Sequence, residues 1–258
     1  MQVDRYTATK KAEDRLFEYR PADGVHVLSV IDGHGGAKAA EMIVQTLSAF
    51  CAAAGNGSDR WFRSPEQLVS RAVEEAASVT RDEWSGAVLT LTIALERGRG
   101  EQGDPLEVIW AQLGDTLAMW RNTDGEIERT PDHNCRSNPD ERDAAVARGG
   151  LYRSGYIMAP DGTGGLQPGR SLGDAYMGPI ASKEPDIGRA RTAGPVVLTT
   201  DGVVAGLRNM PEAEREVFDE LYERIESGDS LEIAVPDVCR HGVMDDITVL
   251  ALRAAASD

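Results

Sequence analysis

Two apolar segments of this 258-residue chain each end in the dipeptide Asp-Gly. Asp32 follows the run His-Val-Leu-Ser-Val-Ile, and Asp201 follows Pro-Val-Val-Leu-Thr-Thr. Short runs rich in Val and Ile predict buried strands. A carboxylate at the end of a buried strand is costly unless a partner group or a bound cation offsets its charge. The fold must therefore compensate these two strand ends.

Asp-Gly occurs five times in the chain, and the surroundings separate the copies into two kinds. Asp23, Asp124 and Asp161 lie in polar stretches and predict ordinary turns. Asp32 and Asp201 differ because an apolar strand precedes each of them. This contrast marks these two as candidates for a shared site.

Two acidic pairs add to the pattern, because Glu13-Asp14 and Asp245-Asp246 also border apolar segments. If the strands lie side by side, four acidic clusters converge at one edge of a sheet. Oxygen-only ligands favour Mg²⁺ or Mn²⁺. Two such ions sharing a carboxylate would activate a bridging water and hold a phosphoryl group for in-line attack. For any one of these acids taken alone we favour an ordinary turn or strand end on an acidic protein, and only the joint pattern favours a metal site.

The order of predicted elements favours an α+β layered fold rather than a doubly wound parallel sheet. Alternation of Leu and Thr predicts a half-buried strand at 87–95, and 106–122 predicts two hairpin-like strands joined at Gly114-Asp115. We expect one domain over residues 1–258, with an irregular, flap-like segment near 150–175. The other predicted elements are strands at 24–32, 194–203 and 245–253 and helices at 36–55, 64–84, 138–150 and 211–228.

Composition excludes several classes of protein. The net charge is −16, and no Lys/Arg cluster suits nucleic acid. Three cysteines lie far apart, which argues against a disulfide framework or a zinc site. Neither a signal-peptide core nor an apolar run of about 20 residues is present, so we expect no membrane partner. We expect a cytoplasmic monomer, with the nucleus as the alternative location.

Eight short motifs occur in one order along the chain. They are Ala-Glu-Asp at 12–14, Asp-Gly-His-Gly-Gly at 32–36, Ser-Gly-Ala-Val-Leu at 85–89, Leu-Gly-Asp at 113–115, Pro-Asp-His-Asn at 131–134, Arg-Ser-Leu-Gly-Asp at 170–174, Thr-Thr-Asp-Gly at 199–202 and Met-Asp-Asp-Ile-Thr at 244–248. In this order the chain resembles the metal-dependent protein phosphatases, also called protein phosphatase 2C. Val88 and Leu89 depart from that family's pattern.

The resemblance implies a four-layer sandwich, in which two central antiparallel β-sheets carry helices on both outer sides. It also implies hydrolysis of phosphoserine and phosphothreonine in phosphoprotein substrates, with two Mg²⁺ or Mn²⁺ ions as cofactors. By the same resemblance, Asp32 would bridge both ions. His34 would be the general acid that protonates the leaving oxygen; a solvated loop histidine is the alternative.

The resemblance also implies the remaining metal ligands. Gly33 would contribute its carbonyl group, and Asp201 and Asp245 would complete one ion's ligand set. Glu13 would act on the other ion through water, with Asp14 close beside it. Arg170, Asp174 and His133 also fall in family motifs, and for them we favour structural pairing over direct chemistry.

One departure concerns the substrate phosphate. The family carries an arginine four residues before its Glu, and this chain has Thr9 there. Lys10 and Lys11 are adjacent, and either could supply a point charge in place of a bidentate guanidinium. The alternative is that both lysines are solvated.

Two further departures concern the metals. Ala205 stands where the family often has an acid that helps bind a third, weaker metal ion together with the residue at Asp115. We therefore do not expect a well-defined third metal site. Asp115 as a plain turn residue is the alternative. Asp246 replaces the family's Asn beside Asp245, and we assign the ligand role to Asp245 by register.

Three functions remain open from the sequence. The first is an active metal-dependent serine/threonine phosphatase. The second, suggested by Thr9 and Ala205, is a catalytically weak pseudophosphatase that acts as a binding or regulatory module. The third is a phosphohydrolase that acts on small phosphoesters.

Overall fold

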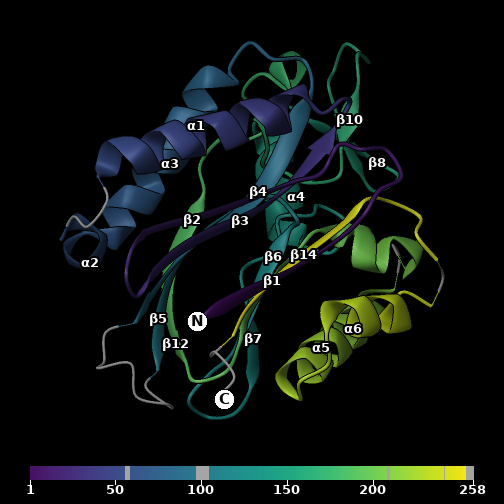
Figure 1. Ribbon diagram of the computed structural model, residues 1–258. Helices are drawn as coiled ribbons and strands as arrows, with labels where there is room; N and C mark the ends of the chain where they lie inside the picture. The colour runs from purple at the N-terminus through teal and green to yellow at the C-terminus, as the bar shows by residue number, and fades with distance from the viewer. Residues whose placement is uncertain (56–58, 97–104, 208–209, 241, 254–258) are drawn as a thin grey trace.

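Two antiparallel β-sheets lie face to face at the centre of the molecule, and helices cover their outer surfaces (Figure 1). The computed structural model describes residues 1–55, 59–96, 105–207, 210–240 and 242–253. Apolar side chains fill all three spaces between the four layers. The α+β sandwich expected from the sequence is confirmed.

The first sheet has the strand order β12-β5-β4-β3-β2, and β11 pairs with one end of β4. Its strands are β2 (Arg15–Ala22), β3 (Val25–His34), β4 (Gly86–Glu96), β5 (Leu106–Leu113), β11 (Leu172–Gly173) and β12 (Asp186–Thr192).

The second sheet has the order β1-β14-β13-β6-β7. Its strands are β1 (Gln2–Ala8), β6 (Leu117–Arg121), β7 (Ile127–Arg129), β13 (Val196–Thr199) and β14 (Ile247–Arg253). β1 and β14, which lie near opposite ends of the chain, pair along their full length.

The helices divide between the two outer faces. Those against the first sheet are α1 (Lys38–Ala54), α2 (Arg60–Arg63) and α3 (Pro65–Val79), and those against the second are α5 (Pro211–Glu226) and α6 (Leu231–Val238). Within the described ranges, no helix combines the length and apolar character needed to cross a membrane.

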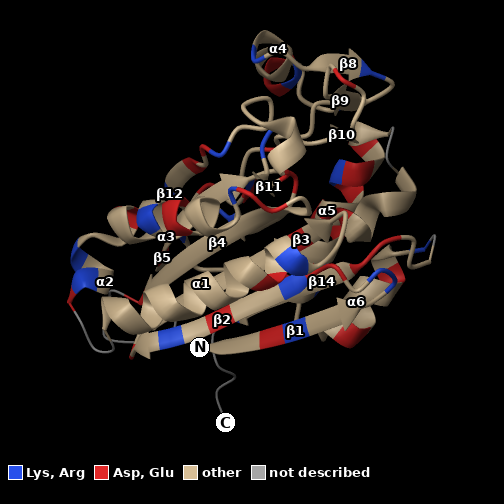
Figure 2. Cartoon of the chain, turned by 90° about the horizontal axis from the view of Figure 1, so that it is seen from above, with Lys and Arg blue, Asp and Glu red and all other residues tan. Residues whose placement is uncertain are grey.

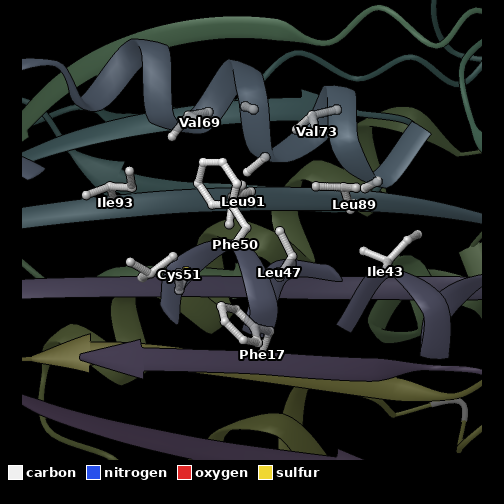
Figure 3. Packing of buried hydrophobic residues seen from close by; sticks show 14 of the residues in the cluster. Phe17, Ile43, Leu47, Phe50, Cys51, Val69, Val73, Leu89, Leu91 and Ile93 are labelled. Atoms are coloured by element: carbon white, nitrogen blue, oxygen red, sulfur yellow. The ribbon is translucent and has the colours of Figure 1, made fainter. Parts of the chain in front are cut away.

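Strand β3 shows why the layers form. Val27 and Ile31 point into the cluster under α1 and α3, whereas Leu28 and Val30 point into the cluster between the sheets. Successive strand residues face opposite sides, so an unbroken apolar run needs cover on both. Figure 3 shows the helix side of this packing, where Leu47 of α1 lies among side chains of the sheet.

Strand β4 differs from its sequence-based prediction. Its alternating threonines indicated a half-exposed strand, yet Thr90 and Thr92 are completely buried. The second sheet covers their face, and the Thr90 hydroxyl donates to Oε1 of Gln112 at 2.6 Å. Satisfied hydroxyls can be buried at little cost, so the alternation could not distinguish water from a second sheet.

The predicted hairpin at Gly114-Asp115 is also wrong. Strand β5 belongs to the first sheet and β6 to the second, so the connection crosses between the sheets. Gly114 has a φ of 103°, a left-handed conformation that glycine adopts readily. The crossing brings Asp115 to the end of both sheets.

The segment near 150–175 is more regular than expected. It contains β8 (Leu151–Arg153), β9 (Tyr156–Met158) and β10 (Gly165–Leu166), which form a small antiparallel sheet that we call the flap. The flap and α4 (Pro139–Ala147) stand together beyond one end of the sandwich (Figure 2). A short 3₁₀ helix, η1 (Ala175–Met177), follows β11.

Candidate active site

A cavity of about 380 Å³ opens at the end of the sandwich beneath the flap. Strand β3 contributes Asp32 through His34, and the crossing between β5 and β6 contributes Asp115. Asp201 begins the 3₁₀ helix η2 (Asp201–Leu207) after β13, and Asp245 lies just before β14. In Figure 2 the acidic residues that precede β14 are red. Four segments far apart in sequence therefore bring carboxylates to one cavity.

The carboxylates in and behind this cavity repel one another. Burial, followed by the charges of Asp201, Asp14, Asp115 and Asp245, raises the pKa of Asp32 well above its ordinary value. Burial is also the main cause that raises the pKa of Asp14 and of Asp115, each to about 7. A divalent cation would relieve this repulsion, because it stabilises the charged form of every carboxylate around it.

These residues fit hard divalent cations by their chemistry, since they present carboxylate and carbonyl oxygens. Among the residues that the structure describes, however, no three His, Cys, Asp or Glu side chains are already grouped to hold a metal ion. The fit therefore rests on the donor type and on the accumulated negative charge.

Two glycines after these aspartates allow close backbone contact rather than a turn. A Cβ atom on Gly33 would lie 2.5 Å from the carbonyl oxygen of Glu13, and one on Gly202 would lie still closer to that of Asp246. Neither glycine has positive φ, and Gly33 lies within β3. By contrast Asp23, Asp124 and Asp161 do lie in turns, as predicted.

The first acidic pair lies behind the cavity wall. The Glu13 carboxylate accepts a hydrogen bond from the Gly36 N–H at 2.6 Å, and Asp14 accepts one from the Thr200 hydroxyl at 2.9 Å. Neither side chain lines the cavity directly, although the Asp14 charge reaches Asp32. The Glu13 bond fixes the glycine-rich turn that follows β3.

The two residues of the second acidic pair, Asp245 and Asp246, have different environments. Asp246 is 4% exposed and accepts backbone hydrogen bonds from the loop between β1 and β2. Burial alone would raise the pKa of Asp246, but these N–H groups hold it well below its usual range. Asp245 instead faces the cavity. The four donors to Asp246 are the N–H groups of Lys10, Lys11, Glu13 and Asp14.

The two lysines differ in direction. The Lys11 ammonium lies 2.8 Å from Oδ1 of Asp245, and Lys11 lines the cavity. The Lys10 ammonium instead donates to the Val243 carbonyl at 3.5 Å. Thr9 does not line this cavity and borders a different depression. Lys11 is therefore the lysine placed to meet an anion in the cavity.

Asp115 is more than a plain turn residue. The Asn134 side-chain amide donates to its Oδ2 atom at 2.8 Å. His133 is buried, and its Nδ1 atom accepts the Gly114 N–H at 3.1 Å, which fixes the crossing that carries Asp115. Ala205 in η2 has no carboxylate to add beside Asp201.

His34 has a partner that the sequence interpretation placed outside the catalytic set. Its Nε2 atom lies 2.9 Å from Oδ2 of Asp174, which is 1% exposed and also accepts the Ser171 hydroxyl at 2.6 Å. Burial lowers the pKa of His34, but the hydrogen bond and charge of Asp174, together with the charges of Asp115 and Glu13, outweigh burial and the pKa is raised. A Cβ on Gly86 would collide with both groups. The Arg-Ser-Leu-Gly-Asp motif indicated that Asp174 matters, but nothing in the sequence showed that its partner is His34.

Arg170, in the same motif, is structural as expected. Its guanidinium bonds the Glu141 carboxylate at 3.1 Å and the Asp186 carboxylate at 2.8 Å. These ion pairs join α4 to β12 beside the flap. Arg170 therefore stabilises the support of the flap and does not line the cavity.

The fold and cavity define an α/β/β/α sandwich protein with an acidic centre at one end of its sheets. The family model for protein phosphatase 2C matches residues 5–206. The chain belongs to this family of serine/threonine phosphatases.

Known proteins of the family are similar over most of this chain. The mitochondrial protein phosphatase 1K of Xenopus laevis is 24% identical over 254 residues, covering 94% of this chain and 64% of that protein. The probable protein phosphatase 2C 32 of Oryza sativa subsp. japonica is 25% identical and covers 82% of this chain and 48% of its own length. This chain thus spans less than two thirds of either relative.

A solved structure supports the fold independently. The serine-threonine phosphatase 2C from Toxoplasma gondii superposes with a TM-score of 0.66 at 18% identity, covering 98% of this chain and 94% of that chain. At this identity the match shows the architecture alone, and the two antiparallel sheets with outer helices agree with it.

The two neighbouring aspartates should respond differently to the same substitution. Asp246→Asn should lower the free energy of unfolding by about 1–3 kcal/mol in metal-free protein, because it weakens several charged hydrogen bonds. Asp245→Asn should leave stability unchanged or raise it, because it removes repulsion, yet should weaken Mn²⁺ binding. Urea unfolding and calorimetry measure the two effects. Equal destabilisation by both variants would contradict the division of roles.

Proposed function

We propose that this chain is a Mg²⁺- or Mn²⁺-dependent phosphatase of phosphoserine and phosphothreonine in proteins. The observation that carries the proposal is the cavity, where mutual repulsion and burial raise the pKa of Asp32 and a histidine with a carboxylate partner lies in the same wall. Family membership supports the reaction class. A phosphoprotein would be the substrate, and a cytoplasmic monomer remains our prediction.

Six residues would hold the two ions. Asp32 would serve both of them, and Gly33 would contribute its carbonyl oxygen. Asp201 and Asp245 would complete the ligand set of one ion, and Glu13, with Asp14 beside it, would act on the other from behind the wall. When bound, two such ions would supply Lewis acidity toward the phosphoryl oxygens and toward water. We propose no firm third site, because Ala205 lacks a carboxylate, although Asp115 borders Asp201.

His34 would act as the general acid. It lines the cavity, and the leaving oxygen of serine or threonine needs a proton because a free alkoxide is a poor leaving group. The Asp174 carboxylate accepts from Nε2 and thereby orients the ring, and it favours the protonated form. Asp174 is in this proposal a positioning residue.

Lys11 would take the place of the missing arginine at position 9. Its ammonium already lies among the cavity carboxylates, at 2.8 Å from Asp245. An ammonium binds phosphate as a point charge and lacks the fork geometry of a guanidinium. We therefore expect Lys11 to contribute mainly to substrate binding.

A binding module without turnover is the second candidate. Thr9, and the lack of a ready-made group of metal-binding side chains among the described residues, favour it. Phosphopeptide binding in the presence of Mn²⁺ without phosphate release would support this function. Faster turnover of small phosphoesters than of phosphopeptides would support the small-substrate enzyme instead.

Removing a metal carboxylate should abolish activity. The parent protein should release phosphate from a phosphothreonine peptide with Mn²⁺, and EDTA should stop the release. Asp201→Asn should lower kcat by about 100-fold or more, since loss of a group that only supports a metal ligand already costs about 10–100-fold. Asp124→Asn, in an exposed Asp-Gly turn, is the matched control and should match the parent. The proposal would be refuted if the parent released no phosphate, or if neither EDTA nor Asp201→Asn changed the rate of release.

The general-acid role of His34 can be tested by comparing substrates whose leaving groups differ in their need for a proton. His34→Ala should slow hydrolysis of alkyl phosphates and phosphothreonine peptides by roughly 10²–10⁴-fold. Aryl phosphates with acidic phenols should lose much less, because their leaving groups need no proton. Asp174→Asn should show the same selectivity with a smaller loss. Equal losses on both substrate types would argue against these roles.

The lysine pair offers its own control. Lys11→Ala should raise KM for a phosphopeptide several-fold with a smaller change in kcat, by about the value of an exposed charge contact. Lys10→Ala should leave KM unchanged, because its ammonium points to the Val243 carbonyl. Steady-state kinetics at constant ionic strength would measure both. A larger effect from Lys10→Ala would reverse the assignment.

A further inference from the structure

Trp84 is an unusually exposed tryptophan at the wall of the catalytic cavity. It lies in the turn between α3 and β4, lines the cavity, and is 60% exposed. Trp61 and Trp120, by contrast, are nearly fully buried. Tryptophan carries the largest apolar surface of any side chain, and it is enriched where proteins bind partners. Its exposure at this place therefore needs a functional reason.

The turn that carries Trp84 is rigidly held on both sides. The Glu83 carbonyl accepts the Ala175 N–H at 3.0 Å, and the Ser85 carbonyl accepts the Asp174 N–H at 3.2 Å. The backbone next to Trp84 is thus fixed to the segment that positions His34. A side chain presented on a fixed backbone loses little conformational entropy when it binds a ligand.

Two tyrosines extend the apolar surface around Trp84. The Tyr176 ring in η1 lies 4.9 Å from the Trp84 ring, centroid to centroid, at an interplanar angle of 34°. Flap residue Gly164 packs so closely on Tyr176 that a Cβ there would lie 2.7 Å from the ring. Tyr156 of β9 is 38% exposed and lines the same cavity. We call Trp84, Tyr156 and Tyr176 the aromatic wall.

The cavity has an aromatic part, the wall, and an acidic part, the centre formed by Asp32, Asp201 and Asp245. The charged side chains that line it are Lys11, His34 and aspartates, and all of them except Asp115 have a place in the proposed reaction. The flap residues beside the wall, Thr163 to Leu166, carry no charge. The acidic centre and the wall line one cavity, and consecutive Cα atoms are about 3.8 Å apart, so we expect a residue flanking a phosphothreonine in the centre to lie beside the wall.

We infer that the aromatic wall selects phosphoproteins that carry an aromatic or other large apolar side chain directly beside the phosphorylated serine or threonine. This inference rests on the proposed phosphatase function and names its substrate class. The wall supplies an apolar surface and ring edges, and aromatic side chains pack on such surfaces in offset or tilted arrangements. The three side chains of the wall carry no charge themselves, so the wall offers a charged flanking residue no ion pair of its own.

The test uses two phosphothreonine peptides that differ only in having phenylalanine or alanine on both sides of the phosphoresidue. The parent should prefer the phenylalanine peptide in kcat/KM. Trp84→Ala should reduce that preference by about three- to tenfold, the range of one aromatic contact. Trp84→Phe should restore most of it. Tyr152→Ala, an exposed flap tyrosine that does not line the cavity, should leave the preference unchanged.

Binding of non-hydrolysable phosphonate versions of both peptides, measured by calorimetry with Mn²⁺, separates this inference from the proposed function. If neither peptide is hydrolysed but the phenylalanine phosphonate binds more tightly in a way that depends on Trp84, the phosphatase proposal is refuted and the inference about the aromatic wall stands. Turnover of both peptides without preference, or an equal loss on both with Trp84→Ala, would overturn the wall and leave the phosphatase intact.

Discussion

The repulsion among carboxylates at one end of the sandwich is the constraint on which the site depends. Asp32 experiences the charges of Asp14, Asp115, Asp201 and Asp245, which come from separate segments of the chain. Such a group is stable only if the surrounding backbone holds it in place and either bound protons or a cation offset its charge. The glycines after Asp32 and Asp201 serve that purpose, because they let neighbouring loops approach without a Cβ between them.

A second set of contacts joins the proposed proton donor to the aromatic wall. Asp174 meets His34 through its side chain and Ser85 through its backbone, while the next residue, Ala175, bonds Glu83. Trp84 lies between those two anchored residues. The orientation of the histidine and the position of the aromatic wall are therefore coupled through one short turn. If both proposals hold, a change in that turn would alter the proposed proton transfer and the proposed substrate choice together.

Several sequence-based expectations succeeded because they depended on local chemistry. The comparison of Asp-Gly pairs separated Asp32 and Asp201 from the three turn copies, since apolar runs precede only those two. Other expectations failed where tertiary contacts decide. The threonines of β4 face a second sheet rather than water, and the β5–β6 connection crosses between sheets instead of forming a hairpin. Sequence periodicity cannot identify which surface covers a strand face.

By itself the sequence determined the long helices and several of the apolar strands with the acids that end them, because apolar periodicity is a property of neighbouring residues. The order of its motifs along the chain gave the four-layer class through the resemblance. Only the tertiary structure decided the division between Asp245 and Asp246, the direction of Lys11 and the pairing of His34 with Asp174. These depend on residues 140 to 236 positions apart in the chain. Such contacts arise from how the sheets close on each other, which no local pattern encodes.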